Sequence, residues 1–253
     1  MAVKLFSCAL LLVCAMACNA ATLYLIGDST MAKGGGGPDT DGWGQYLQPY
    51  LSIPVVNKAI AGRSARSYTA EGRFDTLYTT VKKGDWAIIE FGHNDGFASP
   101  DNGRGDCPGS DVTTTCTIVD NTGKTIVTHT YNYYIQNAVT KFASLGVKTV
   151  VSSPTPINGS FASGAGDRFV GDASLAASRT GADYVDHFDY VIEFYKALGQ
   201  AKVSTFYPHD HTHTSPAGAT VVAQAFVKGL NCGKSALKSS LTSAAKSLPN
   251  GCM

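Results

Sequence analysis

Four short polar segments of the chain contain the residue types that cleave esters or amides. Cleavage through a serine needs a nucleophilic hydroxyl, a base that takes its proton, a carboxylate that orients the base, and donors that stabilise the developing oxyanion. Candidates for all four parts occur in Gly27-Asp28-Ser29-Thr30, in the segment 57–64, in Gly92-His93-Asn94-Asp95 and in Asp210-His211-Thr212-His213.

Ser29, His213 and Asp210 are the candidates for nucleophile, base and orienting carboxylate. Asp210 and His213 are three residues apart, so one turn can place both side chains on the same side, with one imidazole nitrogen facing the carboxylate and the other facing Ser29. Each residue also has an ordinary structural interpretation. A serine after a strand is often a helix N-cap, and Asp210 could cap the following helix while the histidines form a solvated loop.

Three groups are candidate oxyanion donors. Gly62 can bring its backbone N–H close to a substrate because it carries no side chain, and Asn94 can add an amide N–H. The backbone N–H groups at the start of the helix expected after Ser29 are the third, because they can point towards negative charge. Glycine and asparagine also form ordinary tight turns, so only the combination of all four segments favours an enzyme.

The alternating histidines His209, His211 and His213 suggest a metal site as a further alternative, because imidazole is a common metal ligand. No cysteine or carboxylate partner with suitable spacing accompanies them. We therefore expect neither a metal ion nor another cofactor.

The elements that must position these segments follow from the hydrophobic pattern. Short apolar runs rich in β-branched residues predict strands at 22–26, 54–57, 86–91, 148–152 and 182–186. Helical spacings occur at 43–51, 70–79, 132–145, 168–180, 187–198 and 216–230. This alternation predicts an α/β fold, a three-layer α/β/α sandwich around a mostly parallel five-stranded sheet. Ligands bind at the carboxyl ends of such strands, where three of the polar segments lie.

The beginning of the chain is typical of a secretory signal peptide. Lys4 precedes an apolar run at 5–17, and Cys18-Asn19-Ala20 supplies small residues before a cleavage site. The run is shorter than the roughly 20 residues of a membrane anchor. We expect a signal peptide at 1–20, a single domain at 21–253, and a secreted, extracellular protein.

Cysteine usage agrees with export, because an even number, four, remains after residue 20. Four cysteines allow three pairings. Short sequence separation favours Cys107 with Cys116, and Cys232 with Cys252 as a clip on the C-terminal tail. Asn158-Gly159-Ser160 is an N-glycosylation sequon in a polar stretch, so Asn158 is a candidate glycosylation site.

Charge and hydropathy exclude some partners. With 20 basic and 19 acidic residues and no basic block, the chain lacks the charge that nucleic-acid binding requires. A mean hydropathy of −0.01 leaves no room for several membrane spans. We therefore expect that the protein binds neither nucleic acid nor a membrane. We also expect it to be a monomer.

The four segments, in their order along the chain, resemble the blocks of the SGNH, or GDSL-type, hydrolases. The resemblance covers almost all of 21–230 and implies a flavodoxin-like SGNH fold. It also implies Ser29 as nucleophile, His213 as base and Asp210 as orienting carboxylate, with Ser29, Gly62 and Asn94 as oxyanion donors. The expected reaction is ester hydrolysis through an acyl-enzyme.

A closer resemblance concerns the substrate. Gly27 to Ala32, the glycines 34–37, Asp41-Gly42-Trp43-Gly44 and the segment 210–214 look like those of fungal rhamnogalacturonan acetylesterases. This implies acetylated pectic polysaccharide as substrate. Two alternatives stay open: an acetylesterase for another plant polysaccharide such as xylan, and, in a different class, a non-catalytic secreted carbohydrate-binding protein.

Pectin carries galacturonate carboxylates, which a nearly neutral protein must recognise through local charges. Arg63 and Arg66 flank Gly62. We hypothesise that one of them contacts a substrate carboxylate, although arginines at the start of a helix are often merely solvated.

Overall fold

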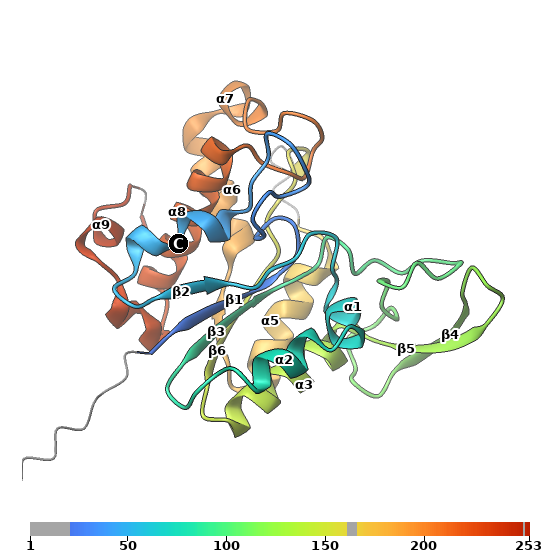
Figure 1. Cartoon of the computed structure of the whole chain (residues 1–253). Coiled ribbons are helices and arrows are strands. Elements are labelled where there is room, and N and C mark those ends of the chain that lie inside the picture. Colours follow the sequence, from blue (N-terminus) through green and yellow to red (C-terminus); the bar gives the residue numbers. More distant parts are fainter. Residues whose placement is uncertain (1–20, 161–165, 250) are drawn as a thin grey trace, which may run out of the picture.

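A central sheet of five parallel strands forms the middle layer of the protein (Figure 1). The computed structural model describes residues 21–160, 166–249 and 251–253, so the expected signal peptide at 1–20 lies outside the described residues. The strand order is β2-β1-β3-β6-β7. The strands are β1 Leu23–Gly27, β2 Val55–Asn57, β3 Trp86–Glu90, β6 Lys148–Ser152 and β7 Asp183–Val185. The predicted parallel sheet is confirmed.

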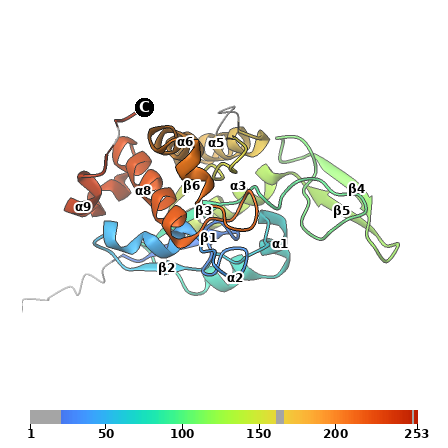
Figure 2. The ribbon, with the colours of Figure 1, turned by 90° about the horizontal axis from the view of Figure 1, so that it is seen from above.

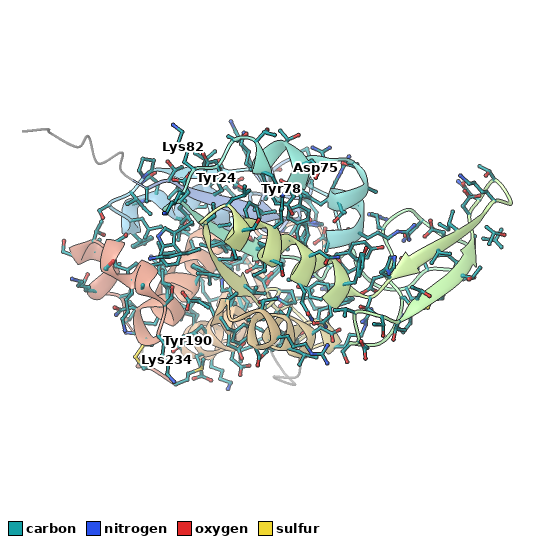
Figure 3. The ribbon with its side chains drawn as sticks, turned by 90° about the horizontal axis from the view of Figure 1, so that it is seen from below. Tyr24, Asp75, Tyr78, Lys82, Tyr190 and Lys234 are labelled. Carbon is teal, nitrogen blue, oxygen red and sulfur yellow. A yellow bond between two sulfur atoms is a disulfide. The ribbon has the colours of Figure 1, made fainter. Side chains whose placement is uncertain are left out.

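Helices cover both faces of the sheet, and alternating residues of the strands separate two cores. In β1, Leu23 and Leu25 belong to one hydrophobic cluster, and Tyr24 and Ile26 to the other. The first cluster packs against α6 His187–Leu198, α7 Gln200–Ser204 and α8 Pro216–Cys232. The second packs against α1 Ala65–Ala70, α2 Arg73–Tyr78, α3 Tyr131–Ser144 and α5 Arg168–Thr180. Figure 2 shows α8 and α1 on opposite sides of the strands, and Figure 3 shows Tyr190 of α6 and Tyr78 of α2 similarly separated. The structure is thus the predicted three-layer sandwich.

Two of the predicted helices differ in the structure. The segment 43–51 forms two short 3-10 helices, η1 Trp43–Tyr46 and η2 Gln48–Tyr50, because Pro49 lacks the N–H that a longer helix needs. The segment 70–79 is divided, because Gly72 adopts a left-handed conformation with φ of 67°. The first part, α1, starts five residues earlier than predicted, at a Ser64–Ser67 capping box.

An antiparallel hairpin was not predicted. Its strands are β4 Thr115–Val119 and β5 Thr125–His129, and it projects from the body of the domain beside α1 (Figure 1). The disulfide between Cys107 and Cys116 joins β4 to the preceding loop. A turn of Asp120-Asn121-Thr122-Gly123 between runs of Thr, Ile and Val is the sequence signal that could have revealed it.

The C-terminal tail packs on α8 and the 3-10 helices. It contains η3 Ala236–Ser240 and α9 Ser243–Lys246. Leu237, Leu241 and Ala245 are buried in the first cluster, and the disulfide between Cys232 and Cys252 closes the tail. Both disulfides have the pairing that sequence separation favours.

Candidate active site

The loops that carry the four polar segments meet at the carboxyl edge of the sheet. The loop after β1 lies beside the segment before α8 above the strands (Figure 1), and the Asp41 N–H donates to the Thr214 carbonyl at 2.8 Å. Ser29 lies in a turn that Asp28 stabilises by accepting from the backbone and hydroxyl of Thr30. The predicted strand-to-helix turn is wrong, because turns and bends follow β1 and the next helical element in the described chain begins at Trp43. Ser29 is therefore not a helix N-cap.

Ser29, His213 and Asp210 form one chain of hydrogen bonds. The Ser29 Oγ lies 2.8 Å from the His213 Nε2, and the His213 Nδ1 lies 2.7 Å from the Asp210 Oδ2. Asp210 Oδ1 accepts from the N–H groups of Thr212 and His213 at 2.7 and 2.8 Å. The helix-cap alternative for Asp210 fails, because Ser215 caps α8. The arrangement can move a proton from the serine hydroxyl to the imidazole.

Asp210 stays ionised although it is partly desolvated. Burial opposes its charge, but hydrogen bonds from the His213 ring and from the two backbone N–H groups outweigh this and lower its pKa to about 2. A negative carboxylate at this position favours the tautomer in which the His213 Nδ1 carries the proton and Nε2 can accept one.

Backbone N–H groups without an acceptor lie at the predicted oxyanion positions. Within the described chain, neither the Ser29 N–H nor the Gly62 N–H donates a hydrogen bond. Gly62 adopts a φ of 74°, a left-handed conformation that favours glycine. The turn that contains it is fixed to the end of β1, because the Ile60 N–H donates a hydrogen bond to the Gly27 carbonyl. Asn94 Nδ2 donates one hydrogen to the Arg63 carbonyl at 3.2 Å, which leaves its second N–H available. Three donors are thus free to bind an oxyanion.

The glycine-rich loop 33–41 packs against His213. A Cβ atom on Gly36 would lie 2.4 Å from the His213 Cγ, far closer than any normal contact. Thr40 fixes the loop, since its hydroxyl accepts from the Gly36 N–H at 3.0 Å and donates to the Gly37 carbonyl at 2.7 Å. Only glycine at position 36 lets the loop lie against the imidazole.

The histidines before α8 do not converge on one point. The His209 Nε2 lies 3.6 Å from the Asp39 Oδ2, whereas both ring nitrogens of His213 are bound to Ser29 and Asp210. Across residues 21–160, 166–249 and 251–253, no group of three or more His, Cys, Asp or Glu side chains could hold a metal ion. The alternating histidines therefore do not form a metal centre with these residues.

Three buried carboxyls, which sequence reasoning missed, lie near these loops. Asp28, Asp95 and Asp106 each have one carboxyl oxygen with no hydrogen-bond partner among the described residues. Burial raises the pKa of Asp28, raises that of Asp95 well above its usual value, and raises that of Asp106 to about 6. Asp95 also accepts from the Ala65 N–H at the start of α1. It therefore ties the segment that carries Asn94 to the helix that follows Gly62.

The two arginines near Gly62, one of which was expected to contact a substrate carboxylate, are bound to carboxylates of the protein. Arg66 makes a two-pronged ion pair with Asp101, and its side chain is only 12% exposed, so the hypothesis is wrong for Arg66. Arg63 is paired with Glu71. Arg104, which sequence reasoning missed, donates from its Nη1 to the Asn94 Oδ1 at 3.2 Å. No sequence motif relates Arg104 to Gly62, because the fold alone brings the two loops together.

Comparison with known proteins identifies the family of the chain. Residues 23–226 match the family model described as GDSL-like lipase/acylhydrolase. A rhamnogalacturonan acetylesterase of Emericella nidulans is 47% identical over 228 residues, 88% of this chain and 90% of that protein. A probable rhamnogalacturonan acetylesterase of Bacillus subtilis is 26% identical over 219 residues, 82% of this chain and 91% of that protein.

Solved structures share the fold at lower identity. A Bacillus subtilis protein has a TM-score of 0.65 at 19% identity, covering 84% of this chain and 56% of its own. An acetyl xylan esterase from Geobacillus stearothermophilus has a TM-score of 0.55 at 20% identity, covering 83% of this chain and 94% of its own. At such identities the similarity concerns the fold only.

Proposed function

Because the chain belongs to the GDSL-like lipase/acylhydrolase family, we propose that it is a serine esterase that removes acetyl groups from acetylated rhamnogalacturonan. The observation that carries the proposed chemistry is the hydrogen-bonded series Ser29, His213 and Asp210 beside three free N–H donors. A binding protein has no need of this series, which argues against the non-catalytic alternative.

The first half of the proposed reaction forms an acetyl-enzyme. Ser29 Oγ attacks the acetyl carbonyl carbon while His213 Nε2 takes the hydroxyl proton. The carbonyl oxygen becomes an oxyanion, which the N–H groups of Ser29 and Gly62 and the Asn94 amide stabilise. The tetrahedral intermediate then collapses, the bond to the sugar oxygen breaks, and His213 returns the proton to that oxygen. Asp210 stabilises the transient imidazolium throughout.

The second half releases acetate. A water molecule attacks the acetyl carbonyl, and His213 Nε2 takes one of its protons. The same three donors stabilise the second oxyanion. Collapse of this intermediate breaks the bond to Ser29 Oγ, which regains a proton from His213, and acetic acid leaves and ionises to acetate in water. The enzyme returns to its starting state without a cofactor.

The proposed substrate rests on the fungal relative. That relative is named for rhamnogalacturonan and is 47% identical to this chain over almost its whole length. The acetyl xylan esterase shares only the fold at 20% identity, so it lends the xylan alternative much less support. We therefore favour the pectic polymer as substrate.

We also propose that the protein acts outside the cell as a monomer. The two disulfides suit an oxidising compartment, and the Asn158 side chain is partly exposed, as a glycosylated asparagine must be. None of the helices in the described part of the chain is both long and apolar enough to cross a bilayer. Sedimentation and glycosidase treatment of the secreted protein test the monomer and the glycan.

Acetate release tests the function directly. Wild-type protein, Ser29→Ala and the exposed control Ser178→Ala are each incubated with acetylated rhamnogalacturonan, acetylated xylan and p-nitrophenyl acetate. We expect the highest kcat/KM on rhamnogalacturonan and a loss of at least about 10³-fold for Ser29→Ala alone. Preference for xylan would overturn the substrate, and near-normal rates for Ser29→Ala would overturn the mechanism.

A further inference from the structure

One arginine beside the proposed oxyanion donors has no carboxylate partner in the described part of the chain. The exposed Arg104 donates from its Nη1 to the Asn94 Oδ1 at 3.2 Å. The same Nη1 lies 3.8 Å from where a Cβ atom of Gly62 would be. The guanidinium therefore lies close to two of the three residues that carry the proposed oxyanion donors.

Neighbouring arginines, in contrast, have carboxylate partners within the protein. Arg66 pairs with Asp101, Arg168 pairs with Asp106, and Arg63 shares Glu71 with Arg73. No aspartate or glutamate within residues 21–160, 166–249 and 251–253 lies within ion-pair distance of Arg104. Four of the five N–H groups of its guanidinium have no acceptor among the residues that the structure describes. This positive charge is thus available to an anion in the site.

The loop that carries Arg104 is held in place from both sides. Asn102 Oδ1 accepts from the Arg104 N–H at 2.9 Å and from the Gly105 N–H at 2.8 Å. The Gly105 carbonyl accepts from Arg66 at 2.6 Å, and a Cβ atom on Gly105 would lie 2.6 Å from the Gly96 carbonyl oxygen. The backbone of Arg104 is therefore packed against the segment that carries Asn94.

An exposed aromatic side chain accompanies this arginine. Phe97 is 45% exposed, and its Cα lies 3.2 Å from where a Cβ atom of Gly105 would be. Sugar sites commonly combine an apolar ring surface with a few placed polar groups. Phe97 and Arg104 offer these two elements on adjacent loops at the edge of the site.

We infer that Arg104 binds a carboxylate of the polymer, so that a uronate residue lies on the oxyanion side of Ser29 during deacetylation. The inference rests on the proposed function, since rhamnogalacturonan carries galacturonate. A planar guanidinium with several free N–H groups matches a carboxylate through two parallel hydrogen bonds. Arg104 also positions Asn94, so part of its contribution is shared by every ester substrate.

The carboxylate contact and the positioning of Asn94 can be separated by assaying two enzymes on two polymers. Wild-type enzyme and Arg104→Gln are assayed for acetate release from acetylated rhamnogalacturonan and from its methyl-esterified form, in which the carboxylates are neutral. We expect Arg104→Gln to lose at least about tenfold more kcat/KM on the charged polymer than on the neutral one. Arg104→Lys should recover part of the excess loss, and high salt should reduce it.

Arg179→Gln is the matched control. It removes the same charge from an exposed position in the last turn of α5, where the Arg179 Nη1 donates to the Ser110 carbonyl, and should give equal rates on both polymers. Equal losses of Arg104→Gln on the two polymers would overturn the carboxylate contact and leave a role through Asn94 alone. A wild-type enzyme that cleaves p-nitrophenyl acetate but neither polymer would overturn the proposed substrate, and with it the subsite.

Discussion

The proposed base His213 is positioned by three different kinds of contact. Asp210 binds its Nδ1, Ser29 binds its Nε2, and the backbone of Gly36 lies against its ring. The Asp210 contact is predictable from a spacing of three residues, and the Ser29 contact, between residues 184 apart, is predictable only from the residue types and their places after the strands. The contact with Gly36 could not be predicted, because a run of glycines indicates only a flexible loop and the sequence does not show which side chain that loop packs against.

Gly36→Ala tests this packing. The added Cβ atom would lie 2.4 to 2.7 Å from three ring atoms of His213, so either the ring or the loop must move. We expect kcat on p-nitrophenyl acetate to fall by at least about tenfold, because a small displacement of a catalytic group is costly. Gly171→Ala in α5, where nothing lies within 4 Å of the new atom, should keep full activity. Unchanged kcat in Gly36→Ala would show that the loop does not position the base.

Asp210→Asn tests the orienting carboxylate. With a pKa of about 2, Asp210 is ionised at every pH at which the enzyme is assayed, so its charge stabilises the imidazolium throughout that range. The neutral amide removes this charge, and its NH₂ group favours the tautomer that protonates Nε2. We expect kcat to fall by about 10³-fold or more from pH 4 to 8, measured as a pH profile. Recovery of wild-type rates anywhere in that range would contradict this role.

At the scale of elements, the strands were predictable and several helix boundaries were not. The short strand β6 is buried except at its first residue and is centred on Val150 and Val151, and its bounds match the prediction. Helix boundaries depend on single residues, as Pro49 and Gly72 show. The β4–β5 hairpin was not predicted because its threonine-rich strands are exposed on one face and resemble a polar loop. Arg104 was missed because it lies in the polar loop that precedes this hairpin.

The capping box of α1 links helix stability to the proposed oxyanion site. The Ser64 hydroxyl accepts from the Ser67 N–H at 3.0 Å, and the Ser67 hydroxyl accepts from the Ser64 N–H at 2.8 Å. Ser64 is fully buried and follows the Gly62 turn by two residues. Ser64→Ala should lower the free energy of unfolding by about 1–2 kcal/mol, measured by urea denaturation. Ser178→Ala, on the exposed face of α5, should not. A stability loss no larger than that of Ser178→Ala would mean that the cap contributes nothing.

At the scale of the whole molecule, buried carboxyls make folding depend on pH. Asp106 is fully buried beside Arg168, yet burial outweighs this ion pair and raises its pKa from 3.8 to about 6. The folded protein therefore binds this proton more tightly than the unfolded chain. The resulting stabilisation is complete below the unfolded value near 3.8 and is lost as the pH rises through about 6. Asp95 acts in the same direction, since burial also raises its pKa.

Asp106→Asn should remove this dependence, because an amide does not titrate. Between pH 4 and 7, the free energy of unfolding of the wild type should fall relative to that of Asp106→Asn by on the order of 3 kcal/mol. Urea denaturation at pH 4, 5, 6 and 7 measures both curves, and Asp39→Asn, which alters a highly exposed carboxylate, should run parallel to the wild type. Parallel curves for Asp106→Asn and wild type would mean that Arg168 keeps the Asp106 carboxylate ionised across this range. A wild-type curve that falls relative to that of Asp106→Asn would instead show that the active-site edge is built on carboxyls that are neutral in mild acid, so that the fold is held most firmly there.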